Sequence, residues 1–259
     1  MSEIDPRAIV SPTMRLGRDV RIGAFAVVGD EVELEEGCIV HPHAVLQGPA
    51  RFGSKNVFHP FCSIGSDPQD LKYAGERTEL EVGDANVFRE WVSVNRGTAG
   101  GGGLTRIGSH NFFMVCAHVA HDCVVGNHTI FSNGATLAGH VVVEDYAQVG
   151  AFSAVHQFRR VGRHGFIGGF TVVTQDVPPF AKVVAARETR CYGPNTVGLE
   201  RRGFSKERIE AIERAFRLLL RSKLNTTQAL EQMRATLDGS EDVAELIRFI
   251  ESAERGIVK

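Results

Sequence analysis

A histidine followed directly by an aspartate, His121 and Asp122, is the pair of residues in this sequence best suited to catalysis. A histidine with an ordinary pKa of about 6.5 is mostly neutral near pH 7 and can accept a proton from a hydroxyl nucleophile. A carboxylate beside it can hold the imidazole in one tautomer and stabilise the imidazolium that forms. The pair therefore predicts a general base, His121, with Asp122 as its orienting group.

The elements that must position this pair follow from a six-residue repeat. An aliphatic residue or phenylalanine recurs at every sixth position from Ile4 to Ile64, again from Val82 to Val94, and, after one seven-residue step, from Ile107 to Val173. This period fits neither an α-helix nor a single strand, and it is typical of the hexapeptide repeat of a parallel β-helix. Three hexads make one coil, with the apolar residue inside, and we expect the glycine that often follows it to turn the corner, frequently at positive φ.

Two segments interrupt the repeat, and a helical pattern follows it. Residues 67–78 and 98–105 are out of phase and predict inserted loops, the second containing four consecutive glycines. Val177-Pro178-Pro179-Phe180 is expected to end the strands, since proline removes ladder donors. Helices are predicted over 206–223, about 226–237 and after Ser240, with Ser205 and Ser240 as N-caps. The predicted fold is an all-β solenoid plus α: a β-helix over 1–190 and a small helical domain over 191–259.

Stacked coils would gather several histidines on one wall. Positions eighteen residues apart fall in one column, which places His121, Gly139 and Gln157 about 4.8 Å apart on successive coils. His118 lies near the same corner. His140 and His156 fall in neighbouring columns on the next two coils.

Composition excludes several classes of protein. The net charge of −2 gives no general field for nucleic acid or membrane binding. No apolar run reaches the ~18 residues of a transmembrane helix, and the N-terminal residues do not resemble a signal peptide. The five cysteines show no paired spacing, which favours free thiols in the cytoplasm and neither a disulfide framework nor a zinc site.

Several motifs, in order, resemble those of the UDP-N-acetylglucosamine 3-O-acyltransferases of lipid A biosynthesis, and the resemblance covers essentially the whole chain. The motifs are Gln69-Asp70-Leu71-Lys72-Tyr73-Ala74-Gly75, His118-Val119-Ala120-His121-Asp122-Cys123, Leu137-Ala138-Gly139-His140, Val155-His156-Gln157-Phe158, Gln175-Asp176-Val177-Pro178-Pro179 and Gly198-Leu199-Glu200-Arg201-Arg202-Gly203-Phe204. The resemblance implies a left-handed coil and a cytoplasmic homotrimer with active sites between subunits. It also implies an (R)-3-hydroxyacyl donor on acyl carrier protein, UDP-N-acetylglucosamine as acceptor, and no cofactor or metal.

The resemblance also implies roles for individual residues. Gly139 would donate its amide to the oxyanion, and Gly169 would leave room for a long acyl chain. The basic segment from Arg201 to Lys223, with eight basic and three acidic residues, would dock the acidic carrier protein. Substrate contacts would come from Gln69, Asp70, Lys72, His118, His140, His156, Gln157, Asn195, Arg201 and Arg202.

Some departures leave alternatives open. Asn95 stands where many relatives have histidine, and Val197 where some have glutamate. The segment 177–200 is one residue longer than in the enterobacterial form of the family. These departures leave a 3-amino sugar open as an alternative acceptor. A γ-class carbonic anhydrase would use His118, His121 and His140 on zinc, although its histidines are usually spaced more widely. A non-catalytic scaffold would leave His121 and Asp122 without a role. The N-acyltransferase of the same pathway normally carries an N-terminal domain, for which repeats starting by Ile4 leave no room.

Overall fold

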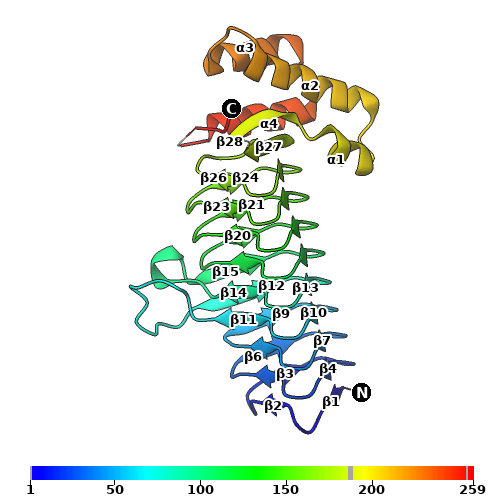
Figure 1. The fold of residues 1–259 in the computed structure, drawn as a ribbon, viewed down its shortest axis with the longest axis vertical. Helices are drawn as coiled ribbons and strands as arrows, with labels where there is room; N and C mark the ends of the chain where they lie inside the picture. The colour runs from blue at the N-terminus through cyan, green and yellow to red at the C-terminus, as the bar shows by residue number, and fades with distance from the viewer. Residues whose placement is uncertain (1, 186–188, 255) are drawn as a thin grey trace.

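The computed structural model describes residues 2–185, 189–254 and 256–259. Short strands stack into a straight column of coils, and helices cover its C-terminal end (Figure 1). Each coil visits three sheets in turn, named here sheets 1, 2 and 3, with parallel pairing between successive coils. The register follows the repeat: Phe112 pairs with Ile130, which pairs with Gln148.

The strands of the described residues are as follows. Sheet 1 contains β1 (Glu3–Ile4), β4 (Arg21–Ile22), β7 (Ile39–Val40), β10 (Val57–Phe58), β13 (Val87–Phe88), β16 (Phe112–Phe113), β19 (Ile130–Phe131), β22 (Gln148–Val149), β25 (Phe166–Ile167), β27 (Ala181–Ala185) and β28 (Thr189–Pro194). Sheet 2 contains β2 (Ile9–Val10), β5 (Val27–Val28), β8 (Val45–Leu46), β11 (Ser63–Ser66), β14 (Ser93–Asn95), β17 (His118–Val119), β20 (Thr136–Leu137), β23 (Ala154–Val155) and β26 (Val172–Val173). Sheet 3 contains β3 (Arg15–Leu16), β6 (Val32–Leu34), β9 (Ala50–Phe52), β12 (Glu79–Val82), β15 (Leu104–Ile107), β18 (Val124–Val125), β21 (Val142–Val143) and β24 (Arg160–Val161).

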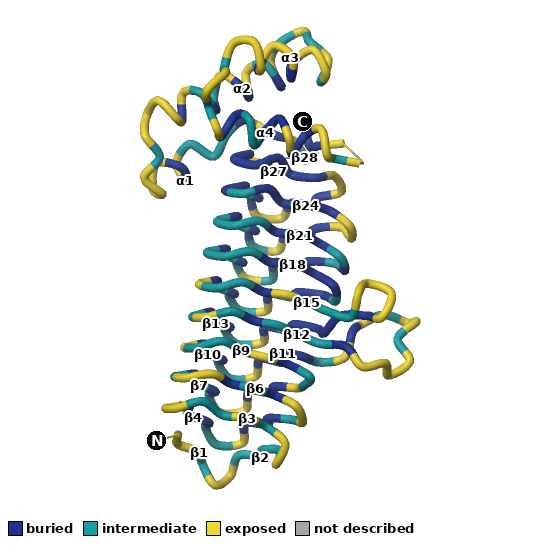
Figure 2. Tube along the Cα trace, turned by 180° about the vertical axis from the view of Figure 1, so that it is seen from behind, coloured by how far each residue is buried: buried dark blue, intermediate teal, exposed yellow. Residues whose placement is uncertain are grey.

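The repeat positions fill the interior of the column, as predicted. In all but the first coil their side chains are buried, and the dark interior positions alternate with exposed corners along the tube (Figure 2). Four phenylalanines stack on successive coils, with ring centroids 4.8–5.3 Å apart: Phe58, Phe88, Phe113 and Phe131. Burying each such ring contributes about 1.5–3 kcal/mol. A rigid apolar core therefore fixes the height of every corner residue.

The expectation for the corner glycines is wrong. Apart from Gly65, Gly126 and its equivalents do not have positive φ; residues two places further on do, among them Phe25 and His128. A Cβ on Gly126 would lie 2.8 Å from the backbone nitrogen of Asp145 on the next coil. Glycine is favoured there because the next coil approaches so closely.

Two loops leave the column side by side (Figure 1). The first lies between β11 and β12, and the second, between β14 and β15, contains a short 3₁₀ helix at Ala99–Gly101. Both leave the corner between sheets 2 and 3, called here the 2–3 corner. The corner between sheets 3 and 1 is called the 3–1 corner.

The C-terminal part differs from the prediction in one respect. The strands do not end at Phe180, because β27 pairs with β25 and then turns back as the antiparallel β28. The helices are α1 (Thr196–Arg201), α2 (Lys206–Arg221), α3 (Thr226–Thr236) and α4 (Glu241–Glu251), with Ser205 and Ser240 as N-caps of α2 and α4, as predicted. The predicted boundary at residue 190 falls within β28, and the division into two domains stays a prediction. None of the described helices combines the length and apolarity that crossing a membrane requires.

Candidate active site

His121 and Asp122 lie at the 2–3 corner, directly after β17. Nδ1 of His121 is 2.7 Å from Oδ2 of Asp122. The Asp122 side chain is 1% exposed and that of His121 14%. Asp122 can accept a hydrogen bond only from a protonated Nδ1, so Nε2 of the neutral ring is left as the proton acceptor. This is the geometry of a general base with an orienting carboxylate.

Two threonines that the sequence analysis missed hold Asp122 in place. Thr98 donates to both carboxylate oxygens, from its backbone nitrogen at 2.7 Å and from its hydroxyl at 2.6 Å. The Thr105 hydroxyl accepts a hydrogen bond from the Asp122 backbone nitrogen at 2.8 Å. The loop must also pass very close: a Cβ on Gly101 would lie 2.1 Å from Cγ of Asp122. The glycine-rich insertion is therefore part of the site, and its only signal in the sequence is the broken repeat.

His140 approaches the same carboxylate from the next coil. Its Nε2 lies 3.6 Å from Oδ2 of Asp122, and its ring meets that of His121 edge-on at 5.3 Å. A metal site needs several His, Cys, Asp or Glu side chains close together. Among the described residues, one group of three such side chains has its potential metal-ligand atoms within 4.8 Å of one another: His121, Asp122 and His140. This group contains a carboxylate where the carbonic anhydrase hypothesis requires His118, and Thr98 and His121 already hydrogen-bond to that carboxylate.

His118 lies on the outward face of β17 and not in the Asp122 cluster. Its Nδ1 is 2.8 Å from the hydroxyl of Ser93 on the coil below. Burial lowers the pKa of His118, and the neighbouring His121 adds a smaller effect in the same direction. His118 is thus a neutral ring at pH 7, able to offer one donor or acceptor to a ligand.

Gly139 stands directly above His121, as its place in the column predicted. A Cβ there would lie 2.6 Å from Cε1 of His121, so only glycine lets the imidazole take this position. Within the described part of the chain, the Gly139 N–H has no hydrogen-bond partner. The corner therefore places a free amide donor near the candidate base, His121.

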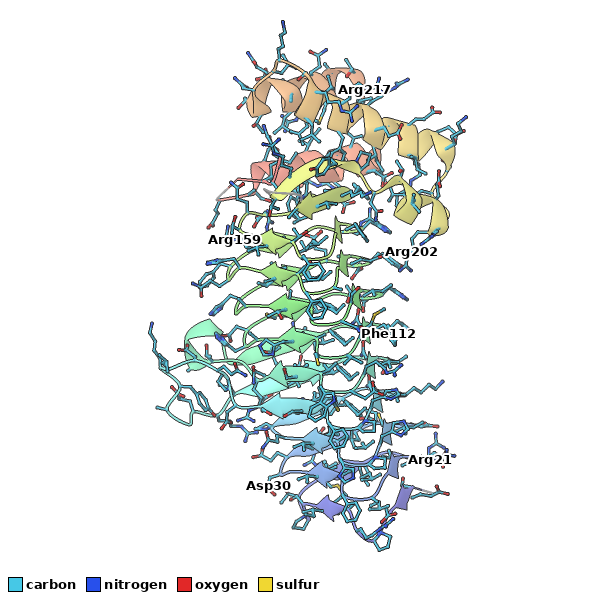
Figure 3. The ribbon with its side chains drawn as sticks, viewed as in Figure 1. Arg21, Asp30, Phe112, Arg159, Arg202 and Arg217 are labelled. Atoms are coloured by element: carbon cyan, nitrogen blue, oxygen red, sulfur yellow. The ribbon has the colours of Figure 1, made fainter. Side chains whose placement is uncertain are left out.

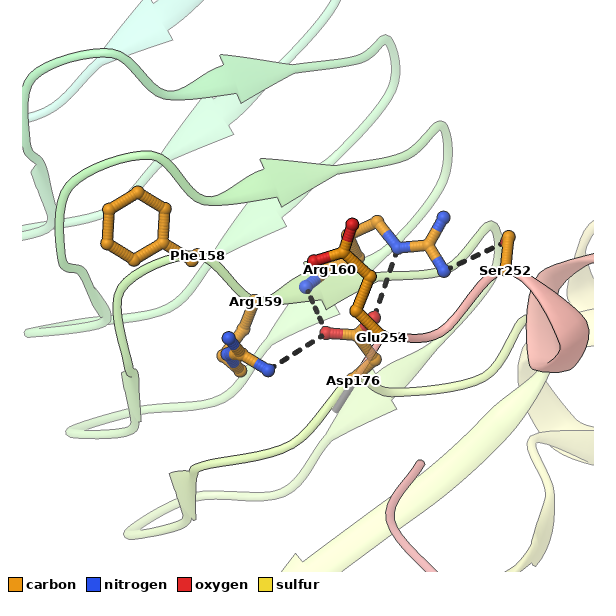
Figure 4. Close-up of a pocket in the computed structure, with 6 residues that line it drawn as sticks. All are labelled: Phe158, Arg159, Arg160, Asp176, Ser252 and Glu254. Atoms are coloured by element: carbon orange, nitrogen blue, oxygen red, sulfur yellow. Dashed lines mark hydrogen bonds and ion pairs between the residues drawn. The ribbon is translucent and has the colours of Figure 1, made fainter. Parts of the chain in front are cut away.

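The other predicted residues of this corner extend toward the helices. His156 and Gln157 are exposed two coils above His121, with Nδ1 of His156 3.3 Å from the Gln157 carbonyl. The ring of Phe158 stacks on His140 at 4.5 Å. Beside it lies a cavity of about 370 Å³ that was not predicted from the sequence. Figure 4 shows the residues that line it: Phe158, Arg159, Arg160, Asp176, Ser252 and Glu254.

Asn195, Arg201 and Arg202 lie elsewhere, around a cavity on the outward face of sheet 1. Its volume is about 590 Å³, and strand residues Ile130, Gln148 and Phe166 form its floor. The Asn195 side chain caps α1 by accepting from the Gly198 nitrogen, and it donates to the His164 carbonyl. Lys182, which the sequence analysis missed, adds a third cation to a lining without acidic residues.

The first loop carries Gln69, Asp70 and Lys72. A carboxylate oxygen of Asp70 accepts a hydrogen bond from the Lys72 backbone nitrogen at 2.9 Å, which shapes the tip of the loop. Among the described residues, no hydrogen bond or ion pair joins these three side chains to His121. A single chain therefore does not bring them to the proposed base.

Buried side chains hold the first residues of this loop against the column. The Arg96 guanidinium donates to the Gly65 carbonyl at 2.6 Å and pairs with the Asp67 carboxylate. Asn95, noted as a departure from relatives, donates to the Asp67 carbonyl at 2.7 Å. In this structure Asn95 therefore anchors the loop.

Gly169 lies apart from both cavities, at the corner between sheets 1 and 2. It is exposed, and a Cβ there would meet the Ala151 carbonyl at 3.2 Å. The predicted role in chain length stays a prediction.

Comparison with known proteins gives one consistent family. Residues 176–258 match the family model described as UDP N-acetylglucosamine O-acyltransferase, domain 2, and residues 13–48 match the bacterial transferase hexapeptide model. Two acyl-[acyl-carrier-protein]--UDP-N-acetylglucosamine O-acyltransferases are each 49% identical: that of Stenotrophomonas maltophilia R551-3 over 99% of this chain and 97% of its own, and that of Myxococcus xanthus over the full length of both. The solved structure of LpxA from Acinetobacter baumannii superposes with a TM-score of 0.94 at 39% identity over 99% of both chains. The predicted left-handed parallel β-helix with C-terminal helices is thereby confirmed.

Proposed function

The chain belongs to the UDP-N-acetylglucosamine O-acyltransferase family, and on that basis we propose that it transfers an (R)-3-hydroxyacyl group from acyl carrier protein to the 3-position of UDP-N-acetylglucosamine. This reaction is the first step of lipid A biosynthesis. The observation that carries the mechanism is the buried hydrogen bond between His121 and Asp122. The five cysteines are unpaired, in keeping with a cytoplasmic enzyme.

The chemical step is a direct transfer with His121 as general base. Nε2 of His121 takes the proton of the sugar 3-hydroxyl as that oxygen forms a bond to the thioester carbonyl carbon. The tetrahedral intermediate then collapses, the carbon–sulfur bond breaks, and the imidazolium returns the proton to the leaving sulfur. Asp122 stabilises the imidazolium, while Thr98 keeps the carboxylate in place.

Gly139 supplies the second contribution. Its free N–H lies next to the base, where the negative charge of the tetrahedral intermediate would develop. A fixed amide donor of this kind contributes about 3 kcal/mol to transition-state stabilisation. The roles of His118, His140, His156 and Gln157 as sugar-nucleotide contacts are part of the same proposal.

A homotrimer would complete the site. The outward face of sheet 3 carries charges in its first five strands, where Arg15 and Arg51 flank Glu33, and valines in the next two, β18 and β21. The outward face of sheet 1 is instead largely apolar, with Val87, Phe112 and Ile130 in register (Figure 3 labels Phe112). An apolar face of this extent favours contact with another copy, and sheet 3 would stay in water.

Such an assembly joins the groups that one chain keeps apart. In a cyclic trimer whose symmetry axis is parallel to the column of coils, equivalent coils of the three subunits lie at the same height. The strands under the Arg201–Arg202 cavity, β19 and β22, belong to the coils that carry Gly139 and Gln157 at the 2–3 corner. The cavity of one subunit can then face the corner of its neighbour, with the loop of Asp70 and Lys72 closing the groove.

The carrier protein would dock on α2. Arg214, Arg217 and Arg221 are exposed and fall on one face of this helix at spacings of three and four residues; Figure 3 labels Arg217. Acyl carrier protein is acidic, so this row is a complementary surface. Long acyl chains would pass Gly169.

The experiment is mass spectrometry of the product after the protein is mixed with a series of 3-hydroxyacyl carrier proteins and two acceptors, UDP-N-acetylglucosamine and its 3-amino analogue. We expect acylation at position 3, and a rate at least about 100-fold lower for His121→Ala. His43→Ala, at a different corner, is the matched control and should keep full activity. The 3-amino analogue tests the alternative acceptor, and a His121→Ala variant with the rate of the wild type would refute the mechanism.

A further inference from the structure

Five stacked rings run along the 3–1 corner, one on each successive coil. Their centroids are 4.8, 4.9, 4.8 and 5.9 Å apart. We name this the ring ladder: His110, His128, Tyr146, His164 and Phe180. Each residue has positive φ, so its side chain projects from the corner in the same direction.

The ladder ends at the segment that carries Arg202. Phe204 packs edge-on against His164 at 4.9 Å. The Arg208 guanidinium lies 3.8 Å from the centroid of the Phe204 ring and is paired with the buried Asp242. Phe204, two residues after Arg202, is therefore held between His164 and Arg208. The rigid column therefore determines where Arg202 emerges.

Arg202 itself is held by the ladder. Its guanidinium lies over the Tyr146 ring, 4.7 Å from the centroid, and its Nη2 is 3.4 Å from the His128 carbonyl. The side chain is exposed and also lines the 590 Å³ cavity with Arg201 and Lys182. A free arginine of this length would sample many rotamers, and a cation–π contact reduces that freedom before the ligand arrives.

We propose that Tyr146 is a positioning residue that holds Arg202 ready for the diphosphate of the nucleotide sugar. The inference rests on the proposed function, because it takes the ligand of the sheet 1 cavity to be a nucleoside diphosphate. Three cations in a cavity lining without acidic residues suit a diphosphate, and arginine binds phosphate oxygens in a bidentate manner. Tyr146 acts through the face of its ring, so its hydroxyl is dispensable.

The test compares the binding of UDP and of uridine by titration calorimetry to the wild type, Tyr146→Leu, Tyr146→Phe and Arg202→Met. Tyr146→Leu should weaken UDP binding about two- to five-fold, the value of a partly exposed cation–π contact, and leave uridine binding unchanged. Tyr146→Phe should bind UDP like the wild type. Tyr146→Leu should add nothing in the Arg202→Met background, because both changes remove one interaction. In the acylation assay Tyr146→Leu should raise KM for the sugar nucleotide and leave kcat unchanged.

The outcomes separate this inference from the proposed function. If the wild type acylates the sugar and binds UDP, but Tyr146→Leu binds UDP as tightly or loses UDP and uridine equally, the positioning role is wrong and the activity stands. If the wild type neither binds UDP nor acylates the sugar, both fall. His110→Ala is the control: it removes a stacked ring at the far end of the ladder, away from Arg202. It should change the affinity for neither UDP nor uridine.

Discussion

At the scale of single residues, the orientation of Asp122 decides whether His121 can act as a base. A buried carboxylate needs hydrogen-bond donors to replace the water it has lost. Thr98 supplies two of them and His121 a third. The sequence predicted His121 and Asp122 because adjacent residues need no folding to meet. It could not predict Thr98, which is brought to Asp122 only by the inserted loop.

Replacing Thr98 by valine tests this orientation. Thr98→Val keeps the backbone donor to Oδ1 and removes the hydroxyl donor to Oδ2, and hydrogen bonds to charged groups are worth about 1.5–3 kcal/mol. We expect kcat to fall about tenfold or more, with little change in KM, in steady-state assays. Thr98→Ser keeps the hydroxyl and should retain most of the activity. A valine variant with wild-type kcat would show that Asp122 needs no help from this loop.

At the scale of elements, the six-residue repeat predicted nearly every strand, because the period reports which residue faces the interior. It failed at the corners. The choice of glycine there depends on the backbone of the next coil, as at Gly126, and not on local φ. It also failed at Phe180, where β27 and β28 continue sheet 1 without a hexapeptide pattern.

The ring ladder should make the protein sensitive to acid. Burial lowers the pKa of His164 from an ordinary value of about 6.5 to about 4, and the nearby Arg163 and Arg202 add to the effect. As the pH falls below about 6.5, His164 therefore becomes protonated in the unfolded chain, whereas in the folded protein it stays neutral until about pH 4. The free energy of unfolding should fall over this window, with a contribution from His164 of about 2 kcal/mol near pH 5.

His164→Phe removes that titration and keeps a ring in the ladder. Urea unfolding at pH 7.5 and pH 5 should show a smaller loss of stability on acidification for this variant than for the wild type, with similar stability of both at pH 7.5. Equal losses in the two proteins would mean that His164 does not govern this sensitivity.

At the scale of the whole molecule, one chain keeps the proposed site residues on separate faces. The proposed base, His121, lies at the 2–3 corner, the arginines line a cavity on sheet 1, and Asp70 and Lys72 lie on a projecting loop. The motifs identified these residues, but their distribution over separate faces could not be read from their order. Only the coil register, which puts the cavity and the corner at equal heights, indicates how neighbouring copies would join them.

Complementation between two inactive variants tests this account most directly. One variant carries His121→Ala and the other Arg201→Met with Arg202→Met; each should have little activity alone. If every site takes its base from one subunit and its arginines from the next, equal mixing by co-expression leaves one intact site in each mixed trimer and restores about a quarter of the wild-type activity. Mixed assemblies that form but remain as inactive as their parents would contradict a site shared between subunits.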